Sequence, residues 1–147
     1  MNIQESIGYL LAQAAKEHRS RVSTAFSDLG IHVGQDMVLL CLWKEDGLTP
    51  SELASRLKVE PGTVSKVLSR MEKVDLVTRR SDPEDARSYK VYLTERGRAL
   101  REPVESRWQE VEDRMVEELS PEEKVVLYRL LSRVRNNLST SINVHPP

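Results

Sequence analysis

The sequence has a single cysteine, few aromatic residues and no long hydrophobic run among its 147 residues. Cys41 alone excludes an internal disulfide framework, and nothing in the composition requires an oxidising compartment. The longest apolar run, from Met37 to Trp43, is far shorter than the roughly 20 residues that cross a bilayer. The first residues lack the basic and apolar regions of a secretory signal. We therefore expect one cytoplasmic domain that does not associate with a membrane.

Motifs for catalysis, cofactors and metals are also missing. The sequence has no glycine-rich phosphate loop, no HExxH, no GxSxG and no paired cysteines. His18, His32 and His145 are scattered, and only Cys41 adds a sulfur ligand to them. We therefore expect that the protein is not an enzyme and that it has no cofactor and no metal site.

The net charge of -1 conceals an uneven distribution of charge along the chain. Residues 56–80 carry seven basic and three acidic side chains, a local charge of +4. Residues 102–123 carry nine acidic and two basic side chains, a local charge of -7. A basic middle is what a phosphate-binding surface needs, although ordinary solvated helix faces explain the same counts equally well.

Hydrophobic periodicity predicts that most of the chain is helical. Apolar residues at helical spacing indicate one long helix over about 3–28, with Gly30 suited to its C-terminal cap. Residues 35–45 are apolar all round, which is typical of a helix buried on most sides.

Capping signals mark the beginnings of further helices. Thr49-Pro50-Ser51-Glu52 and Ser120-Pro121-Glu122-Glu123 each combine a capping box with proline in the first turn. Thr94 is expected to cap a helix that runs to about Leu119, in which Pro103 marks a bend or a late start. The last helix is expected to bury an apolar stripe formed by Leu127, Leu130, Leu131, Val134 and Leu138.

The helix expected over 61–74 has two contrasting faces. Its apolar stripe consists of Val64, Val67, Leu68, Met71 and Val74. The opposite face has small hydroxyl groups, cations and no carboxylate: Thr63, Ser65, Lys66, Ser69, Arg70 and Lys73. A helix with such a face suits the major groove, because small side chains let the backbone approach and cations reach guanine or phosphate.

After Leu76 the apolar period changes from 3.6 toward 2, which predicts a β-hairpin with strands at 77–80 and 88–93. Its tip, 81–87, is polar and contains proline. The hairpin extends the basic surface through Arg79, Arg80 and Lys90, with Arg79 and Arg80 flanking the DNA backbone. Arg87 would enter a minor groove, and Asp85 would hold its guanidinium by a bidentate pair.

The order of these elements is that of a winged helix-turn-helix, and the residues resemble the MarR family of transcriptional regulators. The most specific part is Asp85-x-Arg87 followed by Leu93-Thr94, within a match that is dense over about 49–97. The resemblance implies a mainly α fold with a hairpin wing. Two positions depart from it. Asp75 replaces the usual glycine, so either the turn from helix to strand differs or Asp75 adopts the left-handed conformation, and Ala86 replaces a common basic residue.

The resemblance also implies a homodimer, with 35–97 as the DNA-binding lobe and 1–30 and 98–142 as dimerisation helices within one domain, 1–147. The long first helix and the last two helices carry more apolar surface than one small lobe covers, which agrees with an isologous interface. A symmetric dimer predicts a pseudo-palindromic operator in double-stranded DNA.

Family members commonly bind small anionic or phenolic effectors between the dimerisation helices and the DNA-binding lobe. The residues that would line this junction here are Tyr9, His18, Arg21, Trp43 and Trp108. Core or interface packing is the stronger explanation for the two tryptophans. The sequence therefore predicts a ligand-responsive repressor.

Two other functions remain open. A winged helix without DNA binding serves as a dimerisation or protein-interaction module, but such a module has no need to keep Lys66, Arg70 and Arg87 together. One branch of the family senses peroxides through a cysteine near the start of its first helix, where this chain has none. Cys41 lies instead in an apolar segment, where burial makes a thiol unreactive.

Overall fold

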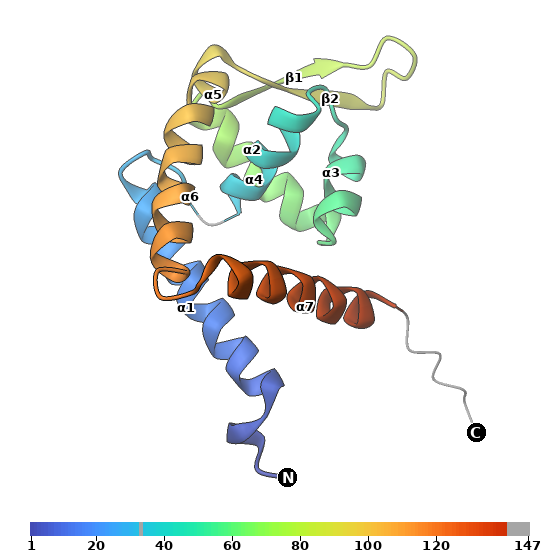
Figure 1. Cartoon of the computed structure of the whole chain (residues 1–147). Coiled ribbons are helices and arrows are strands. Elements are labelled where there is room, and N and C mark those ends of the chain that lie inside the picture. The colour runs from blue at the N-terminus through green and yellow to red at the C-terminus, as the bar shows by residue number, and fades with distance from the viewer. Residues whose placement is uncertain (33, 141–147) are drawn as a thin grey trace, which may run out of the picture. The chain divides into compact units, whose positions relative to one another are not determined.

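A computed structural model describes residues 1–32 and 34–140 of the chain (Figure 1). Position 33 and the residues from 141 onward, His145 and the end of the expected 98–142 segment among them, lie outside the described residues. The chain divides into two compact units, Met1–Val111 and Glu112–Pro147. No helix in the described part of the chain is both long enough and apolar enough to cross a membrane.

The structure is mainly helical with one antiparallel β-hairpin, as the sequence predicts (Figure 1). Helix α6 begins in the first unit and ends in the second. In chain order the elements are the 3-10 turn η1 (Ile3–Glu5), α1 (Ile7–Ser27), α2 (Gln35–Lys44), α3 (Pro50–Leu57), α4 (Pro61–Lys73), β1 (Val77–Ser81), β2 (Tyr89–Leu93), α5 (Glu95–Ala99), α6 (Arg101–Met115) and α7 (Pro121–Ser139).

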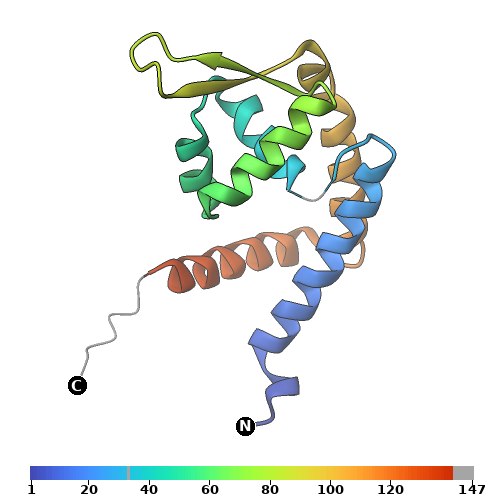
Figure 2. The ribbon, with the colours of Figure 1, turned by 180° about the vertical axis from the view of Figure 1, so that it is seen from behind.

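The core of the first unit forms around α2. Leu39 and Leu42 of this helix are completely buried, with Leu53 from α3, Leu68 from α4 and Val91 from β2. Helix α4 contacts α2, α3 and β1, and it lies beside the hairpin in both ribbon views (Figures 1 and 2). The core therefore fixes α4 and the hairpin against the same set of helices.

Both expected capping boxes are present. The Thr49 hydroxyl accepts a hydrogen bond from the Glu52 backbone N–H at 3.2 Å, and the Glu52 carboxylate accepts one from the Thr49 N–H at 2.8 Å. Ser120 and Glu123 make the same reciprocal pair at the start of α7. These bonds satisfy N–H groups that a helix leaves without an internal partner.

Two of the predicted helices are divided in the structure. The helix expected over 3–28 begins only at Ile7, because Ser6 caps it by accepting a hydrogen bond from the Tyr9 N–H at 3.2 Å. The helix expected from Thr94 breaks at Leu100 into α5 and α6, and α6 ends at Met115 rather than Leu119. Pro103 lies in the first turn of α6, where its missing N–H costs no helical bond, so the late start is the correct alternative.

The prediction that the last helix buries its apolar stripe is wrong for the chain on its own. No residue of α7 is buried, and Leu130, Leu131 and Leu138 are 46%, 44% and 75% exposed. Val74 at the end of α4 is also exposed, whereas the rest of that stripe packs inward.

The turn between α4 and β1 depends on a residue with positive φ. Asp75 has φ 58°, so of the two alternatives for this position the left-handed conformation is the one observed. Its carbonyl oxygen accepts a hydrogen bond from the Thr94 hydroxyl at 2.6 Å. Close by, a Cβ on Gly97 would lie 2.2 Å from the backbone oxygen of Leu76, so this position has no room for a side chain. The beginning and the end of the hairpin are thereby tied together.

Candidate nucleic-acid interface

Helix α4 buries one face and exposes the other. Val64, Leu68 and Met71 are at most 1% exposed. The six residues expected to contact DNA from this helix are all exposed: Thr63, Ser65, Lys66, Ser69, Arg70 and Lys73. Its N-cap, Glu60, makes no side-chain capping bond, and the Glu60 carbonyl accepts hydrogen bonds from the backbone N–H groups of Thr63 and Val64 at 3.0 and 3.3 Å. The helix therefore offers hydroxyl groups and cations on a single face.

The register of the hairpin places its two neighbouring arginines on opposite faces. Arg79 pairs with Val91, which is fully buried, whereas Arg80 pairs with Lys90. Because side chains alternate along a strand, Arg79 points toward the helices and Arg80 points away from them. The guanidinium carbon of Arg80 lies 4.5 Å from the centroid of the Tyr92 ring. The two arginines therefore do not share a face of the hairpin, and their contact with the DNA backbone stays a prediction.

Arg79 is bound within the protein. Its Nε donates to the Glu72 carboxylate, and its Nη2 donates to the Ser69 hydroxyl at 3.3 Å. Its guanidinium carbon lies 4.6 Å from the centroid of the Tyr89 ring. Sequence reasoning missed these contacts.

The tip of the hairpin is shaped by backbone hydrogen bonds. Asp85 accepts a bond from the Arg87 backbone N–H at 3.0 Å, and its carbonyl accepts one from the Ser88 N–H at 3.0 Å. The bidentate pair expected between Asp85 and the Arg87 guanidinium is not among the ion pairs of the described residues. Asp85 thus shapes the turn, and Arg87 remains exposed at the tip.

The five residues expected to line an effector site do not form one cluster. His18 and Trp108 make an edge-to-face contact at 5.4 Å between ring centroids. Trp43 instead donates a hydrogen bond from its indole N–H to the Gly97 carbonyl at 2.9 Å. Tyr9 and Arg21 are exposed on α1. Trp43 therefore has the packing role that the sequence favours.

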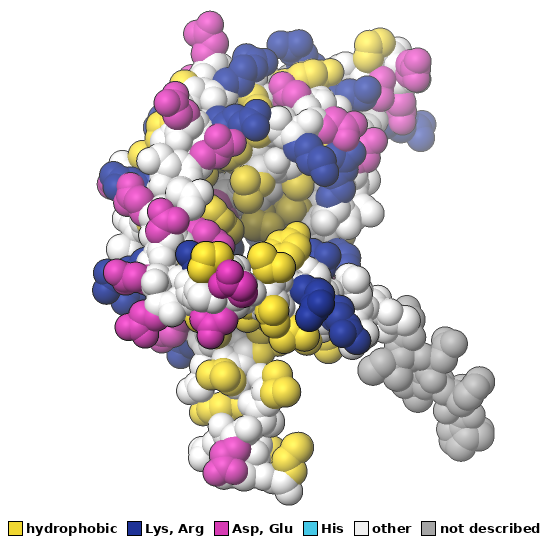
Figure 3. Space-filling model, viewed as in Figure 1, with side chains coloured by type: hydrophobic (Ala, Val, Ile, Leu, Met, Phe, Trp, Pro, Cys, Tyr) yellow, Lys and Arg dark blue, Asp and Glu magenta, His cyan; other side chains and the backbone are white. Residues whose placement is uncertain are grey.

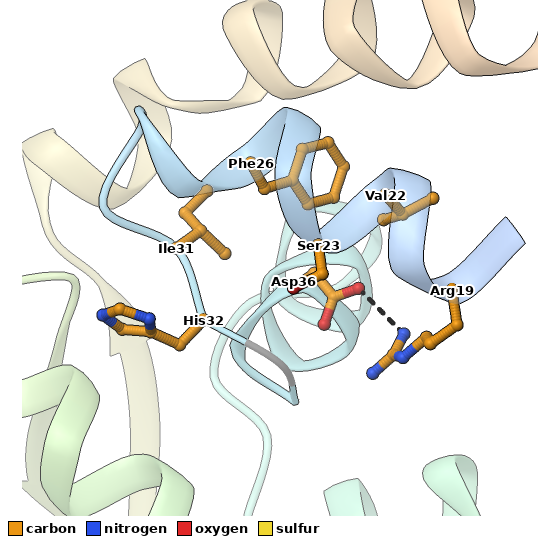
Figure 4. A pocket seen from close by; sticks show the side chains of 7 residues that line it. All are labelled: Arg19, Val22, Ser23, Phe26, Ile31, His32 and Asp36. Atoms are coloured by element: carbon orange, nitrogen blue, oxygen red, sulfur yellow. Dashed lines mark hydrogen bonds and ion pairs between the residues drawn. The ribbon is translucent and has the colours of Figure 1, made fainter. Parts of the chain in front are cut away.

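A small pocket lies at the C-terminal half of α1, close to the beginning of α2 (Figure 4). The carboxylate of Asp36, only 4% exposed, pairs with Arg19 at 3.2 Å and accepts a bond from the Gly34 N–H at 3.1 Å. Figure 4 shows the lining side chains, none of which belongs to the expected set: Arg19, Val22, Ser23, Phe26, Ile31, His32 and Asp36.

The apolar stripe of α1 contains a signal that could have identified Arg19 as a residue of the pocket. Val22 and Phe26, the two buried residues of the helix, follow Arg19 by three and seven positions and therefore share its face. Arg21, the residue chosen from the sequence, lies on a different side of the helix. No comparable local signal identifies Asp36, because its ion pair joins positions far apart in the chain.

Cys41 is half-buried on α2. Burial raises the pKa of its thiol above the ordinary value, and the positive charges of Arg56 and Lys44 only partly oppose this. The thiolate is the reactive form of cysteine, so this environment reduces reactivity with peroxides.

The fold and the exposed basic helix define the class as a winged helix-turn-helix protein. The family model described as MarR matches residues 32–89. The organic hydroperoxide resistance transcriptional regulator of Bacillus subtilis is 32% identical over 102 residues, which cover 69% of each chain. Wild-type MarR from Escherichia coli is 27% identical, with a TM-score of 0.77 over 88% of this chain and 96% of its own.

A third relative is a MarR family protein of Mycobacterium tuberculosis solved with salicylic acid. It is 29% identical, with a TM-score of 0.71 over 91% of this chain and 99% of its own. The present chain belongs to the MarR family of transcriptional regulators. It is a DNA-binding regulator from a family whose members are not enzymes.

Proposed function

We propose that this chain is a ligand-responsive repressor that binds a pseudo-palindromic operator as a homodimer. The observation that carries the proposal is the exposed outer face of α4, where Lys66 and Arg70 stand among small hydroxyl side chains. Arg87, at the wing tip of the same compact unit, is exposed as well. Helix α4 would enter the major groove while the wing reaches an adjacent minor groove.

Each residue of the proposed interface has a role that its environment supports. Thr63, Ser65 and Ser69 have small side chains that let the helix backbone approach the DNA, and their hydroxyl groups add hydrogen bonds. The positive charge comes from Lys66, Arg70 and Lys73. From the hairpin, Arg80 and Lys90 share the outer face and would contact phosphates at the edge of the site. Arg79 and Asp85 belong to the interface through the shape they give to it.

Apolar side chains at both ends of the chain support the homodimer. Ile3, Ile7 and Leu10 are 68%, 82% and 66% exposed, and hydrophobic side chains are visible at the surface of this segment and of α7 (Figure 3). Residues 1–30 and 98–142 would form the dimer interface, and 35–97 the DNA-binding lobe of one domain, 1–147. Two-fold symmetry places the half-sites about one helical turn apart.

The pocket on α1 supports a small anionic or phenolic effector. Arg19 is half-exposed and provides a cation for a carboxylate, and Phe26 provides an apolar wall that also packs against Trp108. The relative from Mycobacterium tuberculosis was solved with such a ligand, salicylic acid. His18, Tyr9 and Arg21 remain candidates along the same helix, while the hydrogen bond of Trp43 favours a structural role for it.

Peroxide sensing through Cys41 is the weaker alternative. The relative from Bacillus subtilis is named for organic hydroperoxide resistance. Because the pKa of Cys41 is raised by burial, its thiol is mostly protonated and poorly nucleophilic at neutral pH. Selection of bound sites from random duplex DNA, carried out with an organic hydroperoxide in place of a phenolic acid, distinguishes the two effectors.

The experiment that tests the proposal selects bound sites from random duplex DNA, with and without phenolic acids. A palindromic consensus is expected, and a phenolic acid should release the protein from it. Arg87→Ala should weaken binding to the selected site by roughly 1–3 kcal/mol, and Lys66→Ala should lower the salt slope by about 1.

Lys16→Ala is the matched control, because it removes an exposed lysine outside the proposed lobe. It should leave specific binding within about 0.5 kcal/mol of wild type. If no sequence is enriched, the result favours a protein-interaction module. If Lys66→Ala and Arg87→Ala both bind like wild type, the proposed DNA-binding surface is wrong.

A further inference from the structure

Arg79 joins three parts of the winged helix. It belongs to β1, it bonds to Glu72 and Ser69 on α4, and it stacks on Tyr89 at the beginning of β2. Ser69 and Glu72 are three positions apart and therefore lie on the same side of the helix. A single side chain of β1 thus contacts both the candidate recognition helix and the other strand of the wing.

The contacts use the properties that distinguish arginine from lysine. The planar guanidinium donates from two nitrogens in fixed directions and offers a flat surface to an aromatic ring. A lysine has the same charge but only a single ammonium, so it cannot reproduce both hydrogen bonds and the stacking. The side chains of Arg79 and Glu72 are 36% and 33% exposed, so these contacts are partly shielded from water.

We propose that Arg79 is a positioning residue that holds the wing at a fixed angle to α4, with Glu72 as its anchor. This inference rests on the proposed function, in which α4 and the wing tip contact the same duplex. Under it, the favourable effect of Arg79 on DNA binding comes from its contacts within the protein. Contact with phosphate is not required.

A fixed wing improves binding because the two contact sites act as one rigid surface. Once Lys66 and Arg70 engage the major groove, Arg87 is already near its own groove, which raises its effective concentration. A loosely held wing would lose conformational freedom when it binds, and that loss reduces affinity. Loosening the wing should therefore weaken DNA binding without removing any DNA contact.

The substitution Glu72→Gln separates this role from a direct one. It removes a negative charge from a DNA-binding surface, which by electrostatics alone strengthens binding. The positioning role predicts the opposite sign: binding should weaken by about 3- to 30-fold. Glu84→Gln is the matched control, because it removes an exposed carboxylate at the wing tip, and it should bind as tightly as wild type or more tightly.

The substitution Arg79→Lys gives a second readout, since it keeps the charge. If Arg79 contacted a phosphate, lysine would replace it and the affinity would be retained. The positioning role predicts a loss similar to that of Glu72→Gln, with an unchanged salt slope, whereas loss of a phosphate contact lowers the slope by about 1. Arg87→Ala should also have a smaller effect in the Arg79→Lys background than in wild type, because the two residues act together.

Hydrogen exchange of the free protein tests the positioning role of Arg79 in the absence of DNA. In Glu72→Gln and Arg79→Lys, amides of β1 and β2 should exchange faster while those of α2 remain protected, and thermal melting should confirm that both variants are folded. Unchanged exchange in the hairpin, with Arg79→Lys binding like wild type and Glu72→Gln binding more tightly, would overturn the inference. It would leave the proposed function intact, which fails separately if Lys66→Ala and Arg87→Ala have no effect.

Discussion

Helices α4 and α7 have similar patterns but different surroundings. Both begin with proline in the first turn and carry an apolar stripe opposite polar residues. Val64, Leu68 and Met71 of α4 are buried by α2, α3 and β1, whereas α7 has no buried residue. Amphipathicity therefore shows that a face must be covered, but it does not show whether the same chain covers it.

The first helix shows the same contrast within one element. Val22 and Phe26 near its C-terminal end are 2% exposed, while Ile7 and Leu10 near its start are 82% and 66% exposed. One end belongs to the core of the first unit, and the other resembles α7. Two kinds of apolar surface follow from this: one that stabilises the fold, and one available to a second copy of the chain.

The largest effect on stability is expected from a substitution in the buried apolar face of α4. Leu68→Ala should lower the free energy of unfolding by about 2–5 kcal/mol, because it removes a fully buried side chain and leaves a cavity. The loss should be the same at every protein concentration in denaturant titrations. If the loss grew as the protein was diluted, α4 would instead be buried by a partner.

A smaller and concentration-dependent effect is expected in the exposed surface. Leu131→Asp should raise the dimer dissociation constant roughly thirtyfold, about 2 kcal/mol, because it places a charge in an apolar interface. Sedimentation at several concentrations measures this change. Asn136→Asp is the matched control, since it introduces the same charge at an exposed polar position of the helix. Equal dissociation of the two variants would remove α7 from the interface.

The smallest effect concerns Cys41, which lies on the boundary between buried and exposed surface. Burial raises the pKa of its thiol in the folded state above the ordinary 9.0, so the folded protein holds this proton more tightly than the unfolded chain does. The resulting stabilisation is complete below that ordinary pKa and is lost as the pH rises above it.

A comparison of wild type with Cys41→Ser measures this contribution. The unfolding free energy of wild type should decrease slightly more steeply with pH in the alkaline range. Parallel curves for the two proteins would show that the thiol titrates alike in both states.

Local signals predicted the elements well. Thr49 and Ser120 were identified as caps because their partners, Glu52 and Glu123, lie three residues away in sequence. Ser6 was missed as a cap because apolar residues at helical spacing continue on both sides of it. The left-handed conformation of Asp75 was one of two alternatives that the sequence left open, because the family has glycine there.

The sequence predicted which residues form the candidate site better than it predicted how their side chains are arranged. The exposed face of α4 follows from helical periodicity, so its six polar residues could be identified in advance. The roles of Arg79 and Asp85 could not, because both depend on which group lies nearest in space. Arg79 faces α4 only because the strand register directs it inward, and Asp85 bonds to the backbone only because the tip turns there.

Periodicity, capping and spacing therefore specify the helices, the hairpin and the basic surface, because each depends on residues a few positions apart. Packing alone places Arg79 beside Glu72 and Asp36 beside Arg19, and it leaves α7 uncovered while it covers α4. These results depend on which surfaces come into contact when the chain folds. A linear pattern contains no direct measure of that, since the hydrophobic effect has no preferred direction and acts equally on any apolar surface within reach.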